Sequence, residues 1–291
     1  MKHVLLTGAT GFLGSHLLEA LLTHGYQVTI LKRSTSDTWR INHLLGRVKS
    51  FDVDQVTIED AFNTQKVDAV IHTVCSYGRN GQAAHEVVET NLMFGLRVLE
   101  ASILFNTDTF LNTDTLLPKY LNVYSLSKKH FAEWLRLCSK NIKVVNLKLE
   151  HMYGPRDDTA KFVPWLIEQL EQGAKRISLT EGNQLRDFVY IDDVVSAYLL
   201  ILQKADQLSG YSEFDVGTGQ LTSVRDFVTK IYDIYKKKRS DSITQLGFGD
   251  IPVRDGELMS LEVDNTELKR LGWEAKVSQK KGLESLLKAV L

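Results

Sequence analysis

The sequence contains few of the residues on which small, cross-linked or metal-bound proteins depend. Its 2 cysteines, Cys75 and Cys138, lie far apart and without CxxC spacing. Such a pair provides neither a disulfide framework nor a metal site, so no metal is expected and both are interpreted as small buried hydrophobic residues. Of only 4 prolines, three (Pro118, Pro155 and Pro164) lie in the middle of the chain, where they separate its segments.

The chain also lacks an excess of charge of either sign and any long hydrophobic run. Lys and Arg total 35 against 36 Asp and Glu, a net charge of -1. Without an overall positive field, neither a nucleic acid nor a membrane is expected as a partner. No apolar run approaches a membrane span of about 18 residues, and the N-terminal apolar segments are too short and glycine-interrupted for a signal peptide. We expect a cytoplasmic protein.

The first half of the sequence alternates short apolar runs with longer segments of helical pattern. Such alternation is typical of βαβ units around a parallel sheet. The expected strands are 3–7, 27–31, 69–72, 110–112 and 144–149, and the expected helices are 12–22 and 83–104. The sequence therefore predicts an α/β fold, a doubly wound parallel sheet with a smaller, mixed C-terminal substrate-binding domain. The cofactor-binding domain is expected to contain residues 1–155 and 186–218. The substrate-binding domain is expected to contain residues 156–185 and 219–291.

A glycine-rich loop follows the first expected strand. Gly8, Gly11 and Gly14 are spaced as GxxGxxG, not GxGxxG, and a helical pattern follows. The first two would allow a tight turn and close approach of a pyrophosphate, and Gly14 would let the helix pack on the strand. A plain turn would explain the glycines alone, but the strand, helix and N-terminal position together favour a dinucleotide. The loop residues expected at the cofactor are Gly8, Thr10, Gly11, Phe12, Leu13 and Gly14.

The second expected strand ends in two cations, Lys32 and Arg33. An NAD-binding protein usually has an acidic residue here for the ribose 2′-hydroxyl, whereas two cations suit a 2′-phosphate. The cofactor is therefore expected to be NADP(H), with an exposed basic turn as the alternative. Asp52 and Val53, after the third strand, are expected at the adenine edge, and Thr73 also at the cofactor.

Tyr124 precedes Lys128 by one helical turn, after a segment 109–115 that reads as a strand. Ligands sit at the carboxyl ends of strands in a doubly wound sheet, where both Gly8 and Thr113 would lie. The tyrosine is thus expected to face the nicotinamide, where the ammonium of Lys128 and an oxidised ring would favour its phenolate. Together they form a candidate acid/base pair.

Taken together, the motifs resemble the extended short-chain dehydrogenase/reductase family, whose members act on nucleotide sugars. The resemblance covers nearly the whole chain and rests on TGxxGxxG at 7–14, Asn91, YxxxK at 124–128, MYGP at 152–155, RDFVYIDD at 186–193 and VGTG at 216–219. The stretches FLNTDT at 110–115, KLEHMYGP at 148–155 and Arg254 through Trp273 are similar to nucleotide-sugar 4-ketoreductases of the CDP-abequose and CDP-paratose synthase group. That group implies NADPH-dependent reduction in deoxysugar and lipopolysaccharide O-antigen biosynthesis.

The resemblance implies a role for each matching residue. Tyr124 donates the proton to the nascent alkoxide, Lys128 lowers its pKa and binds the nicotinamide ribose, and Thr113 bonds the substrate oxygen. Arg186 and Arg254 bind the diphosphate or ribose of the nucleotide, although a surface ion pair is the alternative for each arginine. Asp114 and Thr115 are alternatives to Thr113. A homodimer through the helices that begin near Ala83 and Tyr124 is also implied.

The chain departs from the family pattern in several places. Only ten residues separate Thr113 from Tyr124, and His151 stands where the family often has Asn. His151 is given no chemical role, and Tyr77 and Arg79 either line the sugar site or close a loop.

An epimerase or dehydratase with tightly bound NAD and a nonenzymatic NADP-binding regulator remain alternatives. Thr115 stands where a dehydratase commonly has a second carboxylate. The sequence does not determine the nucleotide base of the substrate, whether its C3 is already deoxygenated, or the stereochemistry of the product at C4.

Overall fold

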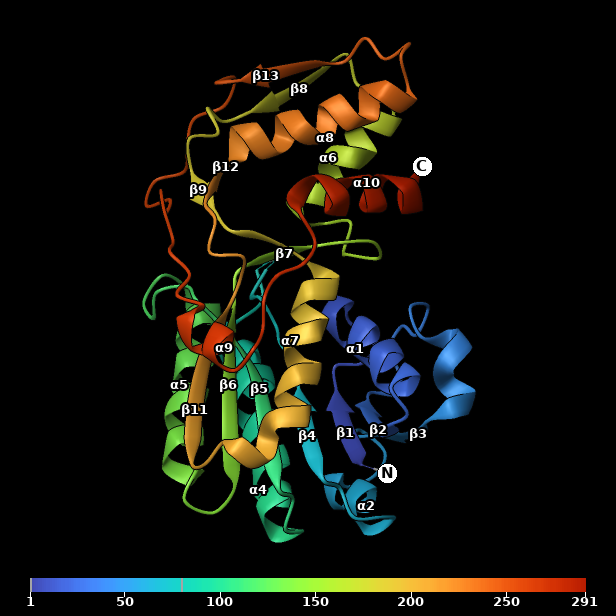
Figure 1. Cartoon of the computed structure of the whole chain (residues 1–291), viewed down its shortest axis with the longest axis vertical. Helices are drawn as coiled ribbons and strands as arrows, with labels where there is room; N and C mark the ends of the chain where they lie inside the picture. Colours follow the sequence, from blue (N-terminus) through green and yellow to red (C-terminus); the bar gives the residue numbers. More distant parts are fainter. Residues whose placement is uncertain (1, 80) are drawn as a thin grey trace. The chain divides into compact units, whose positions relative to one another are not determined.

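The computed structural model describes residues 2–79 and 81–291, which form two compact units (Figure 1). Unit 1 contains the residues up to Leu149 together with Val195–Val216 and Glu267–Trp273, and unit 2 contains Glu150–Val194, Gly217–Thr266 and Glu274–Leu291.

Residues 186–194 belong to unit 2, whereas the expected bounds place them with the cofactor-binding part. Local pairing explains the difference. Strand β10 (Phe188–Tyr190) pairs with β7 (His151–Tyr153), and the carboxylate of Asp193 accepts from the backbone N–H groups of Lys276 and Val277 at 2.8 and 3.0 Å.

Among the described residues of unit 1, seven parallel strands form one sheet in the order β11-β6-β5-β4-β1-β2-β3. They are β1 (His3–Thr7), β2 (Gln27–Lys32), β3 (Lys49–Asp52), β4 (Ala69–His72), β5 (Thr109–Thr115), β6 (Lys143–Leu149) and β11 (Tyr211–Val216). The strand order reverses beside β1, between β1 and β4, which is where ligands bind at the carboxyl ends of such sheets. The predicted α/β fold with a doubly wound parallel sheet is confirmed.

Helices cover both faces of this sheet. Side chains of α2 (Ile58–Asn63), α4 (Phe94–Leu104) and α5 (Val123–Cys138) share one hydrophobic cluster with side chains from β1, β4 and β5. Figure 1 shows α1 (Phe12–Thr23) and α7 (Ile191–Lys204) on the other face. The expected helix 83–104 is interrupted: α3 (Ala84–Val88) leads into a π-helical turn, η2 (Glu89–Met93), and then into α4. The remaining short elements are η1 (Asn42–Arg47), η3 (Ala205–Gln207) and α9 (Thr266–Arg270).

Unit 2 has a mixed architecture of strand pairs and helices. Besides β7 and β10, β8 (Arg176–Leu179) pairs in parallel with β13 (Gln245–Phe248), and β9 (Leu185–Arg186) pairs antiparallel with β12 (Thr222–Ser223). Its helices are α6 (Phe162–Glu171), α8 (Val224–Lys238) and α10 (Gln279–Val290).

Aromatic rings from several of these elements form part of the core of unit 2. The rings of Phe188 and Phe227 stack with their centroids 3.7 Å apart, and Tyr153 packs edge-on against Tyr190 and Phe227. The core therefore ties β7 and β10 to helix α8.

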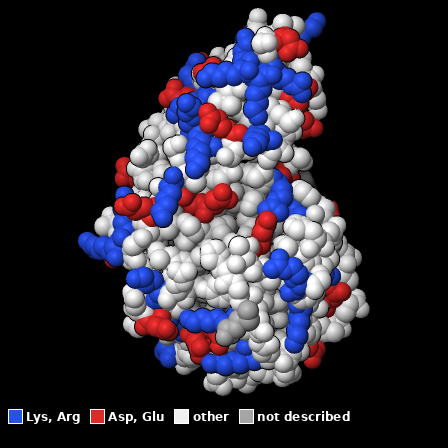
Figure 2. Space-filling view, turned by 45° about the vertical axis from the view of Figure 1, so that its right-hand side comes forward, with Lys and Arg blue, Asp and Glu red and all other residues white. Residues whose placement is uncertain are grey.

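Basic and acidic side chains are interspersed over the face seen in Figure 2. None of the helices in the described part of the chain is both long and apolar enough to span a membrane.

Candidate functional site

The loop between β1 and α1 has no space for a side chain at two of its glycines. Gly8 has φ +72°, and a Cβ there would lie 2.5 Å from Thr73 Oγ1 and 2.9 Å from Val74 N. A Cβ on Gly14 would overlap the carbonyl of Gly8. Gly11 donates its N–H to that same carbonyl at 3.0 Å, which closes the turn. This close backbone packing before a helix N-terminus fits the predicted pyrophosphate site.

Other residues expected at the cofactor surround this loop. Thr73 is bonded to β1, because its Oγ1 donates to the carbonyl of Thr7 at 2.8 Å and its N–H donates to Thr7 Oγ1 at 3.2 Å. The side chains of Phe12 and Leu13 are buried. Their backbone is therefore the part suited to contact a ligand.

Arg40 also contacts the loop, and no sequence motif indicated this residue. Its Nη1 donates to the carbonyl of Thr10 at 3.3 Å, and its guanidinium lies 4.4 Å from the ring centroid of Trp39. In the sequence, Arg40 could have been recognised only as a further cation in the segment after β2, seven positions beyond Arg33.

The two cations at the end of β2 differ in their surroundings. Lys32 forms an ion pair with Asp52, its partner in the β2–β3 register, and its carbonyl accepts from Val53 N at 2.8 Å. Arg33 is exposed, and its guanidinium has no hydrogen bond or ion pair with any described residue. Arg33 thus retains the whole of its charge for a ligand, whereas the charge of Lys32 is offset.

Helix α5 presents Tyr124 and Lys128 in its first turns. Asn122 caps the helix by accepting from Ser125 N at 2.8 Å. Tyr124 is largely buried, and its ring centroid lies 4.9 Å from that of Tyr77. Burial is the largest of the causes that raise the pKa of Tyr124 well above its usual value; Cys75 and Asp114 act in the same direction, and hydrogen bonding with the Thr115 side chain opposes them. The protein's own groups therefore favour the protonated phenol.

Lys128 lies on the same side of the helix and is 1% exposed. Its Nζ is buried without a hydrogen-bond partner among the described residues. Burial lowers the pKa of this ammonium group. Because buried donors are nearly always paired, an unpaired lysine beside Tyr124 indicates a ligand that completes its hydrogen bonds, and the hydroxyls of a nicotinamide ribose fit that need.

Asn91, in the π-helical turn, connects this part of α5 to the chain after β4. Its Oδ1 accepts from Ser76 N at 2.6 Å, and its Nδ2 donates to Ser76 O at 2.8 Å and to Ser127 Oγ at 2.9 Å. Ser127 in turn donates to the carbonyl of Tyr124 at 2.8 Å. The segment that carries Cys75 and Tyr77 is therefore fixed relative to the tyrosine.

The three candidates at the end of β5 have different neighbours. The hydroxyl of Thr113 is bonded to Tyr198 Oη on α7 at 2.7 Å. The carboxylate of Asp114 bonds Lys129 on α5, since successive strand residues point to opposite faces. The hydroxyl of Thr115 accepts from Leu117 N at 3.2 Å, and of the three side chains it is the one that lowers the pKa of Tyr124. Sequence alone left these roles open.

The two predicted substrate-binding arginines belong to unit 2. Arg186 is buried, and its guanidinium donates to Glu257 Oε1 at 2.8 Å and to the carbonyls of Leu185 and Leu258 at 2.9 and 2.6 Å. Arg254 is exposed, and its side chain forms no ion pair or hydrogen bond with the described residues. Of the two, Arg254 has the guanidinium that is open to a ligand.

The residues left without an assigned role also have definite contacts. His151 Nδ1 lies 2.7 Å from Glu150 Oε1, and the guanidinium of Arg79 lies 4.9 Å from the ring centroid of Tyr77. Tyr77 thus packs against both Arg79 and Tyr124.

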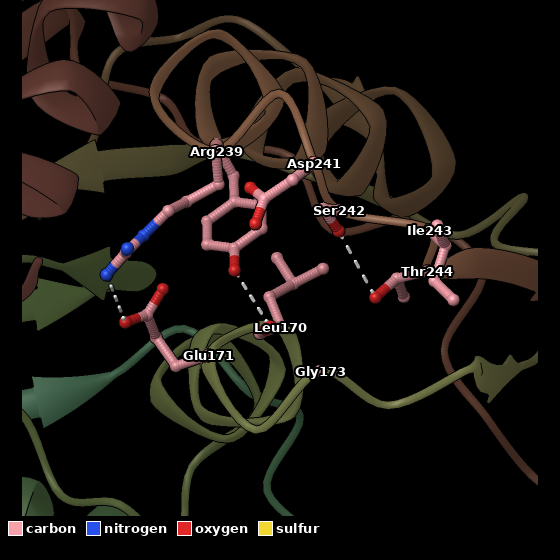
Figure 3. Close-up of a pocket in the computed structure, with 9 residues that line it drawn as sticks. Leu170, Glu171, Gly173, Arg239, Asp241, Ser242, Ile243 and Thr244 are labelled. Atoms are coloured by element: carbon pink, nitrogen blue, oxygen red, sulfur yellow. Dashed lines mark hydrogen bonds and ion pairs between the residues drawn. The ribbon is translucent and has the colours of Figure 1, made fainter.

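Unit 2 also contains a hollow of about 280 Å³ beside the end of α6 (Figure 3). There, Tyr235 Oη donates to the carbonyl of Leu170 at 2.9 Å and Arg239 pairs with Glu171. None of its lining residues is a predicted site residue.

Comparison with known proteins assigns the chain to a family. Residues 4–217 match the NAD dependent epimerase/dehydratase family, and the chain belongs to this family. It is 35% identical to a CDP-abequose synthase of Salmonella typhimurium, over 99% of this chain and 98% of the relative.

Solved structures share this fold. The UDP-glucose 4-epimerase of Thermotoga maritima is 24% identical with a TM-score of 0.85. A UDP-glucuronic acid 4-epimerase of Bacillus cereus, solved with UDP-glucuronic acid and NAD, is 25% identical with a TM-score of 0.83. Each alignment covers 99% of this chain and 98% of the other.

Proposed function

We propose that the protein is an NADPH-dependent reductase of the 4-keto group of a nucleotide-linked 6-deoxy- or 3,6-dideoxyhexulose, acting in the cytoplasm in deoxysugar and O-antigen biosynthesis. A CDP-linked substrate is favoured and a dTDP-linked one is the second choice. The observation that carries the proposal is the pairing of a protonated, largely buried Tyr124 with the unpartnered ammonium of Lys128. The relatedness to CDP-abequose synthase supports the substrate class.

In this proposal, the chain's residues orient the reactants and deliver a proton. Backbone N–H groups at Gly8 to Gly14 hold the cofactor phosphates, and Lys128 binds the nicotinamide ribose. The reduced nicotinamide supplies the hydride when it is bound. Tyr124 donates its phenolic proton to the substrate oxygen as that oxygen gains negative charge, and Thr113 or Thr115 bonds the same oxygen. Arg254 binds the diphosphate or ribose of the substrate through its open guanidinium, and Arg186 makes the same contact by exchanging its bond to Glu257 for one to the substrate.

NADP(H) is proposed over NAD(H) on the charges that follow β2. Arg33 provides an exposed, unpaired guanidinium, and an arginine fork suits a phosphate. Lys32 contributes less than the sequence predicted, since Asp52 offsets its charge. A reductase that releases its cofactor every turnover is consistent with this choice.

A homodimer through α4 and α5 is part of the proposal. These helices and the adjoining turn expose large apolar side chains in the described structure: Met93, Leu104, Trp134 and Leu137. Exposed apolar side chains on neighbouring helices are typical of a subunit interface.

A panel of CDP-, dTDP- and UDP-linked 4-keto-6-deoxysugars, each incubated with NADPH and purified protein, tests the function. We expect that, with at least one CDP- or dTDP-linked sugar, the absorbance of NADPH falls in proportion to the product formed. Substrate conversion without net loss of NADPH, by a protein that carries tightly bound NAD, would instead identify an epimerase.

A further inference from the structure

Lys129, the residue directly after the predicted catalytic lysine, holds a buried carboxylate at the end of β5. Its Nζ donates to Asp114 Oδ2 at 3.1 Å and also to the carbonyl of Thr115. Asp114 is 2% exposed. A buried carboxylate is stable only when it is paired and hydrogen-bonded, and Lys129 is the cation that pairs with it.

The other bonds of Asp114 fill the rest of its acceptor positions. Asn146 Nδ2 on β6 donates to Oδ2 at 3.0 Å, and Thr115 N donates to Oδ1 at 2.7 Å. Asn146 is itself fixed, because its Oδ1 accepts from Asn112 Nδ2 at 2.7 Å. Both carboxylate oxygens therefore already accept from protein donors, and they face helix α5 and the neighbouring strand.

The ammonium groups of the two adjacent lysines therefore have different surroundings. Successive residues leave a helix about 100° apart, so Lys128 and Lys129 point in different directions. Lys128 is unpartnered, whereas Lys129 links α5 to the last residues of β5. This link lies in the first turns of α5, at the level of Tyr124 and Lys128.

We propose that Lys129 is a positioning residue for the reaction: it fixes the turn that carries Tyr124 and Lys128 against the end of β5, and it withholds Asp114 from acid/base chemistry. The expected change in the pH profile of kcat rests on the proposed reductase function. The expected change in cofactor affinity does not. It assigns Asp114 to the scaffold of the site and leaves Tyr124 as the proton donor.

Cofactor binding tests the proposal without any substrate. Lys129→Met removes the ammonium group and keeps much of the side-chain length. We expect it to weaken NADPH and NADH alike by roughly tenfold, the equivalent of about 1.4 kcal/mol, because both cofactors share the nicotinamide ribose that Lys128 binds. Lys129→Arg should bind both close to wild type. The matched control is Lys119→Met, which removes a partly exposed lysine that pairs with Glu133 and lies near the same end of α5.

A pH profile separates positioning from a general loss of stability. In Lys129→Met the charge of Asp114 is uncompensated, and since Asp114 already raises the pKa of Tyr124, the high-pH limb of kcat should move to higher pH. Other titratable groups around this turn are Cys75, His72, Tyr77, Tyr198 and Lys128. On the strand side, Glu213 bonds Asn146 and Tyr211 is close enough for Asp114 to raise its pKa. Lys129→Met also removes a charge that lowers the pKa of Lys128, and Asp114→Asn removes one that raises it. Lys129→Met with Asp114→Asn removes both charges and should therefore return the limb toward wild type.

The result that overturns the proposal is a Lys129→Met protein that binds both cofactors as tightly as wild type and Lys119→Met do. Failure of the proposed function has a different signature. In that case wild-type protein binds the cofactors but reduces no nucleotide sugar, and the binding comparison still decides the role of Lys129.

Discussion

At the scale of single residues, desolvation gives Tyr124 and Lys128 complementary properties. Burial raises the pKa of the phenol and lowers that of the ammonium group, because both charged forms are disfavoured away from water. A phenol that keeps its proton at neutral pH is suited to donate it. An ammonium group buried without a protein partner is suited to bind a polar ligand.

Replacement of the tyrosine tests the proton-donor role. Tyr124→Phe should lower turnover by about 10²–10⁴-fold, the usual contribution of general acid catalysis. NADPH binding should change little, since the ring and its packing on Tyr77 remain. Steady-state rates and cofactor titration with the same preparation provide the measurement, and an unchanged turnover would exclude Tyr124 from this role.

The cations after β2 should contribute unequally to cofactor choice. Arg33→Ala is expected to weaken NADPH much more than NADH, because its unpaired guanidinium is the one open to a 2′-phosphate. Lys32→Ala should have the smaller effect on this preference, since Asp52 offsets the lysine's charge. Equal losses of NADPH and NADH affinity in Arg33→Ala would argue against the phosphate assignment.

His72 should make the protein less stable in mild acid. Burial and the nearby charge of Lys128 lower the pKa of this histidine to about 3. Below its unfolded value of about 6.5 the unfolded chain binds a proton that the folded protein does not, so stability falls with falling pH until about pH 3.

The contribution of His72 between pH 6.5 and 5 should be about 1.6 kcal/mol of unfolding free energy, measured by urea denaturation. His72→Gln should reduce the pH dependence by that amount. An unaltered slope in His72→Gln would contradict the assignment.

At the scale of elements, the sequence predicted the parts whose pattern is local. The glycine spacing, the strand 3–7 and the tyrosine and lysine one turn apart each depend on neighbouring residues, and they appear as β1, the loop and the first turns of α5. The Lys32–Asp52 pair could not be predicted in the same way, because it needs the β2–β3 register. The bond from Arg186 to Glu257 joins positions 71 residues apart, for which no local pattern exists.

Two glycine substitutions, one in the β1–α1 loop and one in the first turn of α1, should differ sharply in stability. Gly14→Ala places a methyl group into the carbonyl of Gly8 and should cost about 1–3 kcal/mol or prevent folding. Gly11→Ala places its Cβ 3.3 Å from that oxygen and should cost less. Thermal unfolding of both variants provides the comparison, and equal melting temperatures would show that the loop packs differently.

At the scale of the whole molecule, the exposed apolar residues of α4 and α5 predict self-association. Trp134 and Leu137 are 46% and 58% exposed. Trp134→Glu with Leu137→Glu should convert a dimer to a monomer in sedimentation velocity, because charges disfavour burial in an interface. Ile243→Glu alters an exposed apolar residue of unit 2 and serves as the control. A wild-type protein that sediments as a monomer would refute the dimer.

Transfer of isotope from the cofactor tests the central claim most directly. NADPH deuterated at the transferring position of C4 is incubated with the sugar that the panel selects, and the product is examined by mass spectrometry and NMR. The account predicts one deuterium at C4 of the sugar and one free NADP⁺ for each product molecule. A converted sugar without deuterium, with the NADPH unconsumed, would contradict it.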